Sequence, residues 1–312
     1  MRAFIFPGQG NQAVGMGKAL AASSATARAV FEEVDHALGQ NLFKLMCDGP
    51  ESELMLTENA QPAIMANAIA SLRVLEVEGG VRLSEQCDFV AGHSLGEYSA
   101  LCAAGAIPLS VTASLLKLRG RAMQSAVPVG VGAMAALLGA DIERAEALAE
   151  AAAQGETCTV ANDNDPGQVV ISGHKGAIDR AIELVRDHGI KRGILLPVSA
   201  PFHCPLMQPA ADDMAAALAS TTIHSPLVPL YANITAAPAD SPQIISAQLV
   251  GQVTGRVRWR ESAIAMAEAG VTHFVEFGGK VLSPMVRRSA GEEVKATSVV
   301  SMDDIEALLK EL

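Results

Sequence analysis

Short apolar runs alternate along the chain with longer stretches in which apolar residues recur every three or four positions. The run RAFIF at 2–6 predicts a buried strand, because a proline and a glycine end it, and DFVAG at 88–92 predicts a second strand. Between them, helical spacing predicts helices around 25–38 and 61–78. Strands separated by helices in this way are typical of a parallel sheet with helical crossovers.

The middle of the chain carries a different order of elements. After the second strand, a helix is expected to open at Ser94 and end near Gly105, and another covers about 110–125. From Gly132 to Ser199 the predicted order is βαββαβ, which is ferredoxin-like. Its predicted elements are strand 133–138, helix 141–153, strand 158–162, a turn at 163–168, strand 169–173, helix 175–188 and strand 193–198.

The larger pattern then resumes. Its predicted elements are helix 204–219, strand 228–233, helices near 242–254 and 260–269, strand 273–277, helix 280–290 and strand 296–300. We therefore predict an α/β fold in which a large α/β-hydrolase-like domain with a parallel sheet, residues 1–128 and 199–312, carries an inserted ferredoxin-like βαββαβ small domain, residues 129–198.

Composition and charge exclude some partners. Half of the 312 residues are apolar and only 4% are aromatic, which suits helices packed closely on a sheet better than an aromatic-lined sugar or nucleic-acid groove. The formal net charge of −11 would repel a phosphate backbone, so we expect no nucleic-acid partner. An acidic substrate or partner must instead meet a local cluster of cations.

The cysteines and the apolar runs indicate a cellular compartment. The five cysteines contain no C-x-x-C pair and are typical of reduced thiols in a cytoplasm: Cys47, Cys87, Cys102, Cys158 and Cys204. The apolar run at the start of the chain is too short for a signal-peptide core, and no run reaches the roughly 18 apolar residues of a membrane span. We expect a cytoplasmic protein that does not bind membranes.

The stretch FVAGHSLGEYSA, residues 89–100, supports two interpretations of Ser94. Ser94 and Glu97 fit a capping box, in which the serine only begins a helix. A cap does not require Gly92 and Gly96, whereas a nucleophile on a cramped strand-to-helix turn does, so the G-x-S-x-G pattern favours a nucleophile. The N–H of Leu95 at the helix start would then be able to stabilise an oxyanion.

A serine nucleophile needs a base, and the chain has seven histidines. His203 lies in VSAPFHCPLM, between a strand end and a helix start, where α/β sheets present ligand-binding loops. His93 adjoins Ser94 and is expected to support the site. Structural or solvated roles are expected for the other five: His36, His174, His188, His224 and His273.

One arginine is predicted to face the core. On the helix at 110–126, Arg119 falls in the sector of four apolar residues, Leu115, Leu118, Ala122 and Met123, whereas Lys117 and Arg121 fall on the opposite side. A buried guanidinium needs an anion. Its partner is either one of the chain's acidic side chains, in a structural salt bridge, or a substrate carboxylate held bidentately.

The glycine-rich segment FPGQGNQAVGMGK, which starts at Phe6, does not fit a nucleotide site. Gly8, Gly10 and Gly15 do not make G-x-G-x-x-G, and Met16 stands where a Walker A loop needs lysine. The loop can still donate backbone N–H groups to an oxyanion.

Taken together, six segments resemble one family. FPGQGNQ, GHSLGEYSAL, LRGRAMQ, DPGQVVISG, PFHCPLMQPA and GKVL occur in the order and spacing of bacterial malonyl-CoA:acyl carrier protein transacylases. The resemblance covers essentially the whole chain. The sequence departs from the family pattern at Asn11, where serine is usual, and in VEFGGKVL at 275–282, which is one residue shorter.

The resemblance implies roles for particular residues. Ser94 would be the nucleophile, His203 its general acid and base, and Arg119 the clamp on the malonyl carboxylate. The backbone N–H groups of Gln9 and Leu95 would form the oxyanion hole.

Three further residues follow from the same resemblance. The backbone carbonyl of Gln252 would orient the imidazole in place of a triad aspartate, and Asn162 would lie at the small domain's edge of the cleft. Phe202 would crowd an α-methyl branch, because a phenylalanine at this position accompanies malonyl selection in related polyketide acyltransferases.

The implied reaction is a ping-pong transfer. Malonyl-CoA would load a malonyl-serine, and the phosphopantetheine thiol of acyl carrier protein would collect the group for fatty acid synthesis. The resemblance implies a monomer that holds neither a metal nor a cofactor of its own. The alternatives are an α/β-hydrolase-type thioesterase or esterase, a trans-acting polyketide acyltransferase, and a carrier-binding subunit without activity.

Carrier protein is acidic, so local cations are expected to steer it. The three candidate clusters are Lys191 with Arg192, Arg256 with Arg258, and Lys280 with Arg287 and Arg288. Each cluster is equally compatible with scattered solvated charges.

Overall fold

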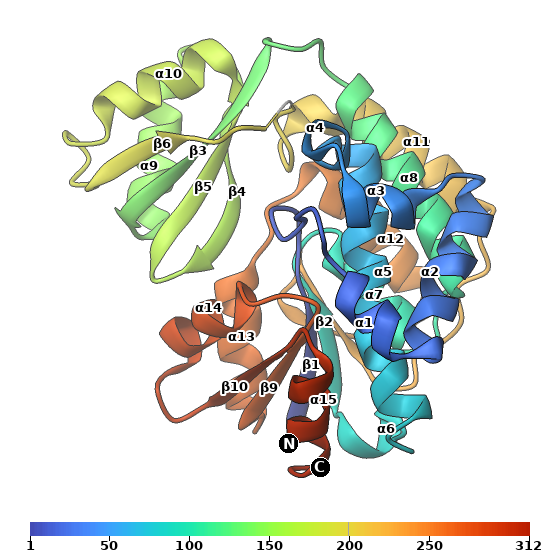
Figure 1. Ribbon diagram of the computed structural model, residues 1–312. Coiled ribbons are helices and arrows are strands. Elements are labelled where there is room, and N and C mark those ends of the chain that lie inside the picture. The colour runs from blue at the N-terminus through green and yellow to red at the C-terminus, as the bar shows by residue number, and fades with distance from the viewer. Residues whose placement is uncertain (199) are drawn as a thin grey trace.

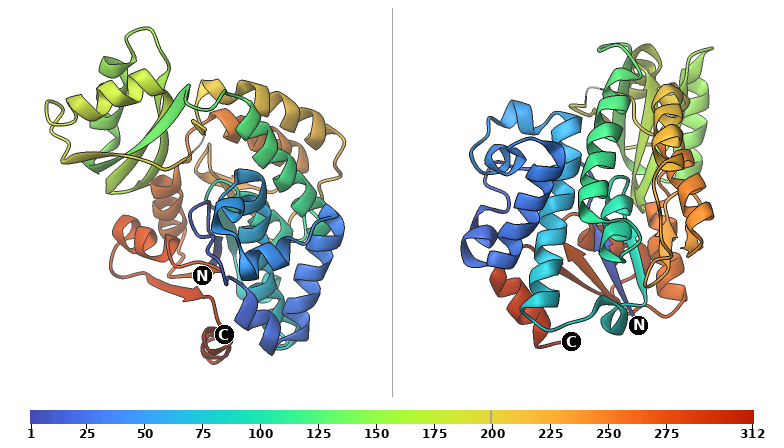
Figure 2. Two further views of the ribbon diagram at one scale, coloured as in Figure 1. Left: turned by 45° about the horizontal axis from the view of Figure 1, so that its top comes forward. Right: turned by 90° about the vertical axis from the view of Figure 1, so that its right-hand side faces the viewer.

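The computed structural model describes residues 1–198 and 200–312, which form two units, each built around its own β-sheet (Figure 1). One unit holds a six-stranded sheet and the other a four-stranded sheet. The smaller unit lies at one end of the molecule, and both termini lie at the other end (Figure 2). The predicted α/β fold with a separate small sheet is confirmed.

The large sheet is parallel except at one edge. Its strand order is β10-β9-β1-β2-β7-β8, and only the pair of β7 and β8 is antiparallel. The prediction of a parallel sheet is therefore wrong at this edge, because the sequence pattern gave no sign of the three-residue β8. The strands are β1 (Arg2–Phe6), β2 (Phe89–Gly92), β7 (Leu230–Ala232), β8 (Ala237–Ala239), β9 (His273–Phe277) and β10 (Lys295–Val299).

Alternating side chains on β1 separate two apolar cores. Phe4 and Phe6 pack in the core that includes α2, α5, α7 and α8, whereas Ala3 and Ile5 pack in the core that includes α13 and α14. These two sets of helices lie on opposite sides of the sheet (Figure 1). The helical segments of this unit are α1 (Lys18–Ser23), α2 (Ala25–Leu38), α3 (Leu42–Asp48), α4 (Glu51–Leu54), α5 (Thr57–Val77), α6 (Leu83–Gln86), α7 (Gly96–Ala103), α8 (Leu109–Ser125), the 3₁₀ helix η1 (Pro205–Met207), α11 (Gln208–Ala219), α12 (Pro242–Thr254), α13 (Trp259–Glu268), α14 (Leu282–Ala290) and α15 (Met302–Leu309).

The helices differ from the predictions mainly at their ends. Helix α5 begins at Thr57 rather than at residue 61, with Pro62 inside it, because burial along most of its length stabilises a turn that lacks one N–H. The predicted helix at 204–219 starts with the 3₁₀ turn η1. The short helices α1, α3, α4 and α6 were missed, since they are too short to show an apolar period. Within the described stretches, none of the helices is long and apolar enough to cross a bilayer.

The small unit has the predicted βαββαβ order of elements. Its strands form one antiparallel sheet in the order β4-β5-β3-β6, with a separate apolar core. The predicted turn at 163–168 is wrong, because both strands continue into it and only Pro166 separates them. The predicted helix at 175–188 ends earlier, at Leu184. The elements are β3 (Gly132–Ala140), α9 (Ile142–Ala153), β4 (Cys158–Asp165), β5 (Gly167–His174), α10 (Lys175–Leu184) and β6 (Arg192–Leu195).

Strand β4 joins the small unit to the large one. Val257 N–H donates to the Ala161 carbonyl at 2.8 Å, and Asp163 N–H donates to the Val257 carbonyl at 2.9 Å. The side chain of Asp163, 1% exposed, accepts three contacts of 2.8–3.0 Å from the Arg260 guanidinium.

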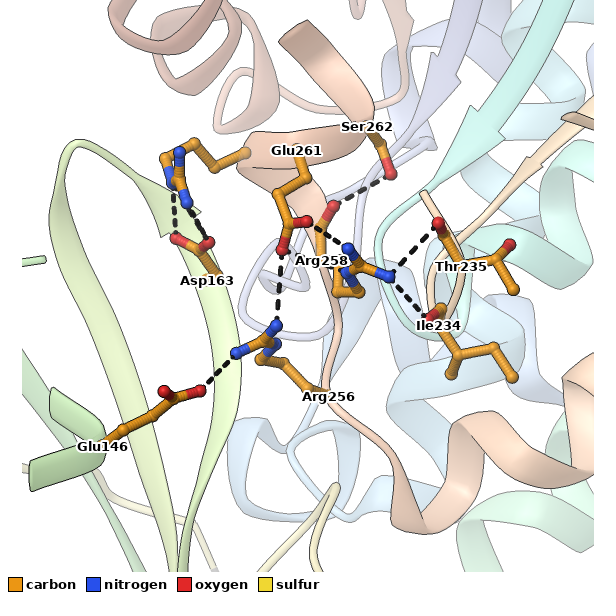
Figure 3. Close-up of polar contacts among 9 residues, drawn as sticks. Glu146, Asp163, Ile234, Thr235, Arg256, Arg258, Glu261 and Ser262 are labelled. Atoms are coloured by element: carbon orange, nitrogen blue, oxygen red, sulfur yellow. Dashed lines mark hydrogen bonds and ion pairs between the residues drawn. The ribbon is translucent and has the colours of Figure 1, made fainter. Parts of the chain in front are cut away.

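Two further ion pairs strengthen this junction. Arg256 pairs with Glu146 of α9 at 2.8 Å (Figure 3), and Arg288 pairs with Asp165 at 2.6 Å. The extension of β4 beyond its predicted end thus has a cause, because its last residues are held by partners in the large unit.

A buried carboxylate fixes the start of α14. Glu276 lies at 0% exposure on β9, and its two oxygens accept the N–H groups of Val281, Leu282 and Ser283 at 2.8–3.0 Å. A negative charge is favourable there, since the first N–H groups of a helix lack partners in the helix itself. The same contacts order the loop in the segment VEFGGKVL.

The E276Q variant should be less stable by about 2–4 kcal/mol, because an amide nitrogen would then face backbone donors and the charge at the helix start would be lost. Urea unfolding followed by circular dichroism measures the change. The matched control is E268Q on the exposed end of α13, which should shift the midpoint little. Equal midpoints for the two variants would contradict this account of Glu276.

Candidate active site

Ser94 lies on a sharp turn between β2 and α7. Its φ of 54° is in the left-handed region, which a residue with a side chain rarely adopts. The turn is possible only with glycine on both sides, because a Cβ on Gly92 would lie 1.9 Å from the Gly96 backbone and one on Gly96 would lie 2.2 Å from the Phe6 carbonyl oxygen. The argument from G-x-S-x-G is therefore confirmed in its geometry.

The alternative of a capping box is wrong. Helix α7 starts at Gly96, and no side chain caps it. The Ser94 hydroxyl is instead 2.7 Å from His203 Nε2, and the Glu97 carboxylate accepts from Gln252 Nε2 at 2.6 Å.

His203 is arranged to act as a base toward Ser94. Its Nδ1 lies 2.8 Å from the Gln252 carbonyl oxygen, which can only accept, so Nδ1 carries the proton and Nε2 is free to accept from the serine. Burial, and then the charge of Arg119, lower the pKa of His203 to about 3. The imidazole is consequently neutral at physiological pH, as a general base must be.

The Gln252 carbonyl occupies the place of a triad acid. Among the described residues, no carboxylate contacts His203. This arrangement disfavours the hydrolase alternative, which called for an acidic partner.

Arg119 faces inward, as predicted, and is 1% exposed. Its guanidinium donates to Gln61 Oε1 at 2.8 Å, to Gln252 Oε1 at 2.8 Å and to Ser94 Oγ at 3.2 Å. No carboxylate of the described residues pairs with it, and its Nε–H has no acceptor there. The structural salt bridge is therefore ruled out within these residues, and the cation beside the nucleophile is available to an anion.

Leu118 is the exception in the predicted apolar sector. It is 38% exposed, because the buried arc of α8 is centred on Leu115, Leu116, Arg119 and Met123 rather than on the predicted set.

Sequence reasoning missed three residues of the network. Asn233, just after β7, accepts the Ser94 N–H at 2.8 Å and donates to the Gly92 carbonyl at 2.6 Å, so it holds the turn. Gln61 lies on α5 and contacts Arg119, and Glu97 contacts Gln252. Gln61 was detectable in principle, because it is a polar residue in an otherwise apolar helix. No feature of the sequence marked Asn233.

Ser94 and His203 open onto a cavity of about 590 Å³ between the two units. Its lining includes Gln9 and Arg119 from the large unit and Asn162 from β4 of the small unit. Phe202, 8% exposed, lines it as well. The cavity thus brings together side chains from distant parts of the chain that were predicted to share a site.

The two residues predicted to supply the oxyanion hole lie in loops next to the nucleophile turn. Leu95 directly precedes α7, and Gln9 lies in the loop after β1. Within the described residues, neither of these N–H groups has a hydrogen-bond acceptor.

His93 connects the nucleophile turn to the small unit. Its Nε2 is 2.8 Å from Asn164 Oδ1 on β4, and burial lowers the pKa of the imidazole. The supporting role expected for His93 agrees with this contact. His174 and His273 make hydrogen bonds with Thr157 and Thr297, away from the site.

Three of the seven cations proposed to meet an acidic partner already pair with acidic residues of the chain. Arg256 and Arg258 both bind Glu261, as Figure 3 shows, and Arg288 binds Asp165. The groove of about 800 Å³ beside Arg256 and Arg258 contains neither Ser94 nor His203. The other four, Lys191, Arg192, Lys280 and Arg287, have no acidic partner among the described residues, and Arg287 donates instead to the Ala296 carbonyl at 3.2 Å.

Comparisons with known proteins identify one enzyme family. Residues 3–302 match the family model described as "Acyl transferase domain". The malonyl CoA-acyl carrier protein transacylase of Escherichia coli (strain K12) is 44% identical over 287 residues, which are 92% of this chain and 92% of that protein. The enzyme of the same name from Bacillus subtilis (strain 168) is 41% identical over 312 residues, covering 99% of this chain and 96% of that protein.

Solved structures give the same result. The crystal structure of acyl-carrier-protein-S-malonyltransferase from Bartonella henselae superposes with a TM-score of 0.97 at 49% identity, covering 99% of this chain and 98% of that one. A malonyl-transacylase solved in complex with a type II PKS acyl-carrier protein superposes with a TM-score of 0.95 at 38% identity, covering 100% and 99%. Likeness of this extent in sequence and structure means that the chain belongs to the malonyl CoA-acyl carrier protein transacylase family.

Proposed function

We propose that this protein transfers the malonyl group from malonyl-CoA to the phosphopantetheine thiol of acyl carrier protein and so supplies fatty acid synthesis. The observation that carries the proposal is the Arg119 guanidinium, buried, without a carboxylate partner among the described residues, and 3.2 Å from Ser94 Oγ. A thioester with a free carboxylate needs both groups at once, because Ser94 attacks the thioester while Arg119 binds the carboxylate. The names of the relatives support the same reaction.

In the first half-reaction Ser94 Oγ attacks the thioester carbonyl while His203 Nε2 takes the hydroxyl proton. The N–H groups of Gln9 and Leu95 stabilise the oxyanion. The carbon–sulfur bond then breaks, and His203 returns the proton to the leaving CoA sulfur, which leaves a malonyl ester on Ser94.

The second half-reaction reverses these steps with a new thiol. His203 takes the proton of the phosphopantetheine thiol, the sulfur attacks the ester carbonyl, and Ser94 leaves as its hydroxyl after receiving that proton. The cavity between the units must exclude water during this time, because water would hydrolyse the ester.

Three residues select the acyl group, Arg119, Asn162 and Phe202, whereas Gln252 positions the base. Arg119 holds the malonyl carboxylate, and the Gln252 carbonyl keeps the imidazole in the tautomer that the reaction needs. Asn162 and Phe202 limit the acyl pocket, and Phe202 disfavours an α-methyl branch through its bulk.

The proposal also covers the folds of the two units, the oligomeric state and the cellular compartment. The large unit is α/β-hydrolase-like, residues 1–128 and 199–312, and the small unit is ferredoxin-like, residues 129–198, as its strand order β4-β5-β3-β6 supports. The protein acts as a monomer in the cytoplasm, and the five free cysteines are in keeping with that compartment.

The S94A variant should lose transfer of malonyl from malonyl-CoA to carrier protein by about a thousandfold or more, because no ester can form. The wild-type protein, exposed briefly to malonyl-CoA, should gain one malonyl adduct on Ser94 in intact-protein mass spectrometry, and S94A should gain none. Fatty-acid and polyketide carriers are compared as acceptors in the same assay. A wild-type protein that transfers malonyl without forming the adduct would rule out the scheme.

The R119A variant should lose kcat/KM for malonyl-CoA by roughly 10²- to 10³-fold and gain relative activity on acetyl-CoA. The carboxylate loses its partner, whereas a neutral acyl group no longer meets a buried cation. R121A is the matched control, since Arg121 lies on the same helix and binds the partly exposed Glu58. Equal losses on both substrates in R119A would indicate a purely structural arginine.

Carrier protein should contact Lys191 and Arg192 at the start of β6, the strand whose other end leads to the cavity residues Leu196 and Val198. The double variant K191E/R192E should raise KM for carrier protein by about tenfold at low salt and leave KM for malonyl-CoA unchanged. The control is R82E/K310E, which reverses the charge just before α6 and the charge just after α15, two helices far from the small unit (Figure 1). The same KM for carrier protein in both double variants would place the docking surface elsewhere.

A further inference from the structure

Glu97 is a buried carboxylate beside the site to which the proposed reaction assigns no role. It lies in the first turn of α7 at 1% exposure. Its Oε2 accepts from Gln252 Nε2 at 2.6 Å and from the Asn233 N–H at 3.3 Å. No described residue donates a hydrogen bond to its Oε1.

These contacts fix the amide of Gln252. A carboxylate accepts hydrogen bonds and does not donate them, so the NH₂ of Gln252 must point to Glu97 and its Oε1 must point to Arg119. The Gln252 amide therefore lies between the negative charge of Glu97 and the positive charge of Arg119 and is hydrogen-bonded to both.

Glu97 and Arg119 balance each other across this amide. From α8, Arg119 is the only charged group of the described residues that faces Glu97, and Tyr98 is the neighbouring titratable group on α7 itself. The strands and helices packed on α7 contribute amides, Asn233 and Gln252, rather than charges. A buried guanidinium without this carboxylate would be uncompensated.

We propose that Glu97 is the counter-ion of Arg119 in the free protein and takes up one proton from solvent, on Oε1, when a malonyl carboxylate binds Arg119. The inference rests on the proposed function. Two carboxylates and one guanidinium in a buried site leave one negative charge uncompensated, and protonation of Glu97 removes it. Glu97 is then a positioning residue in the free protein and a determinant of malonyl affinity.

The direction of the pH dependence follows. Burial raises the pKa of Glu97 to about 7, and a second carboxylate on Arg119 raises that pKa further. Below pH 7 Glu97 is already neutral, so malonyl affinity does not depend on its titration. Above pH 7 binding must be accompanied by proton uptake, so the dissociation constant rises by up to about tenfold per pH unit until the pKa of the complex is reached.

The experiment measures binding of malonyl-CoA and acetyl-CoA to S94A by isothermal titration calorimetry from pH 6 to 9. S94A is used because it cannot form the ester. The ratio of the two dissociation constants removes the titration of the CoA phosphates, which the ligands share. In S94A the preference for malonyl should fall by about tenfold or more between pH 7 and pH 8.5.

Two variants test whether Glu97 causes this fall. In S94A/E97Q the preference should stay constant within about twofold, because the amide is always neutral and its oxygen can keep both contacts made by Oε2. S94A/E76Q is the matched control: burial also raises the pKa of Glu76 on α5, outside the site, and this variant should retain the fall. A fall of the same size in S94A/E97Q would overturn the inference.

A second measurement does not depend on folding of the E97Q protein. Titration of S94A in two buffers of different ionisation enthalpy at pH 8 should show uptake of up to one proton per malonyl-CoA and none per acetyl-CoA. If malonyl-CoA is still preferred but no proton is taken up, the role of Glu97 is refuted and the proposed function is not. No preference for malonyl over acetyl at any pH would instead contradict the proposed function.

Discussion

The site depends on a guanidinium that is buried without an ion pair to any described residue. Arg119 is 1% exposed, and its neighbours Gln61 and Gln252 offer only amide oxygens. These neutral acceptors satisfy the hydrogen bonds of Arg119 without a direct salt bridge, and the nearest negative charge, on Glu97, lies on the far side of the Gln252 amide, so the guanidinium can still bind an anionic substrate group directly. The position of Gln252 is central, because its side chain contacts Arg119 while its backbone carbonyl orients His203.

Both reacting side chains stand on strained backbone. Ser94 has a φ of 54° and His203 a φ of 58°. Such conformations persist where the surroundings fix them from several sides. Asn233 holds the serine turn from β7, and Gln252 holds the imidazole and the Ser94 carbonyl from α12. Elements far apart in sequence therefore determine one serine–histidine distance of 2.7 Å.

The sequence predicted the helices, strands and buried positions that the spacing of its apolar residues marks. Strand β1, helices α2 and α8, and the βαββαβ order were found because long apolar patterns mark them, and Arg119 was found from its helical phase. The roles of Gln252 and Gln9 came only from resemblance to a family. Asn233 and Glu97 were missed as parts of the site, because their contacts join residues 136 to 158 positions apart, as in the bonds of Asn233 and Gln252 to Glu97 and Ser94. Local patterns carry no information about such distances, nor about the ends of β4, which partners in the large unit extend.

The ion pairs at the junction fix the cavity more than they stabilise the fold. Asp163 and Asp165 have side chains only 1% and 4% exposed, so desolvation offsets much of what their arginines contribute. A shifted small unit would separate these pairs and leave carboxylates buried without a partner, which costs several kcal/mol. Only one placement of β4 avoids that cost. Asn162 lies between Ala161 and Asp163, whose backbones bond to Val257, and Asn164 binds His93, so this placement also sets the wall that faces the nucleophile.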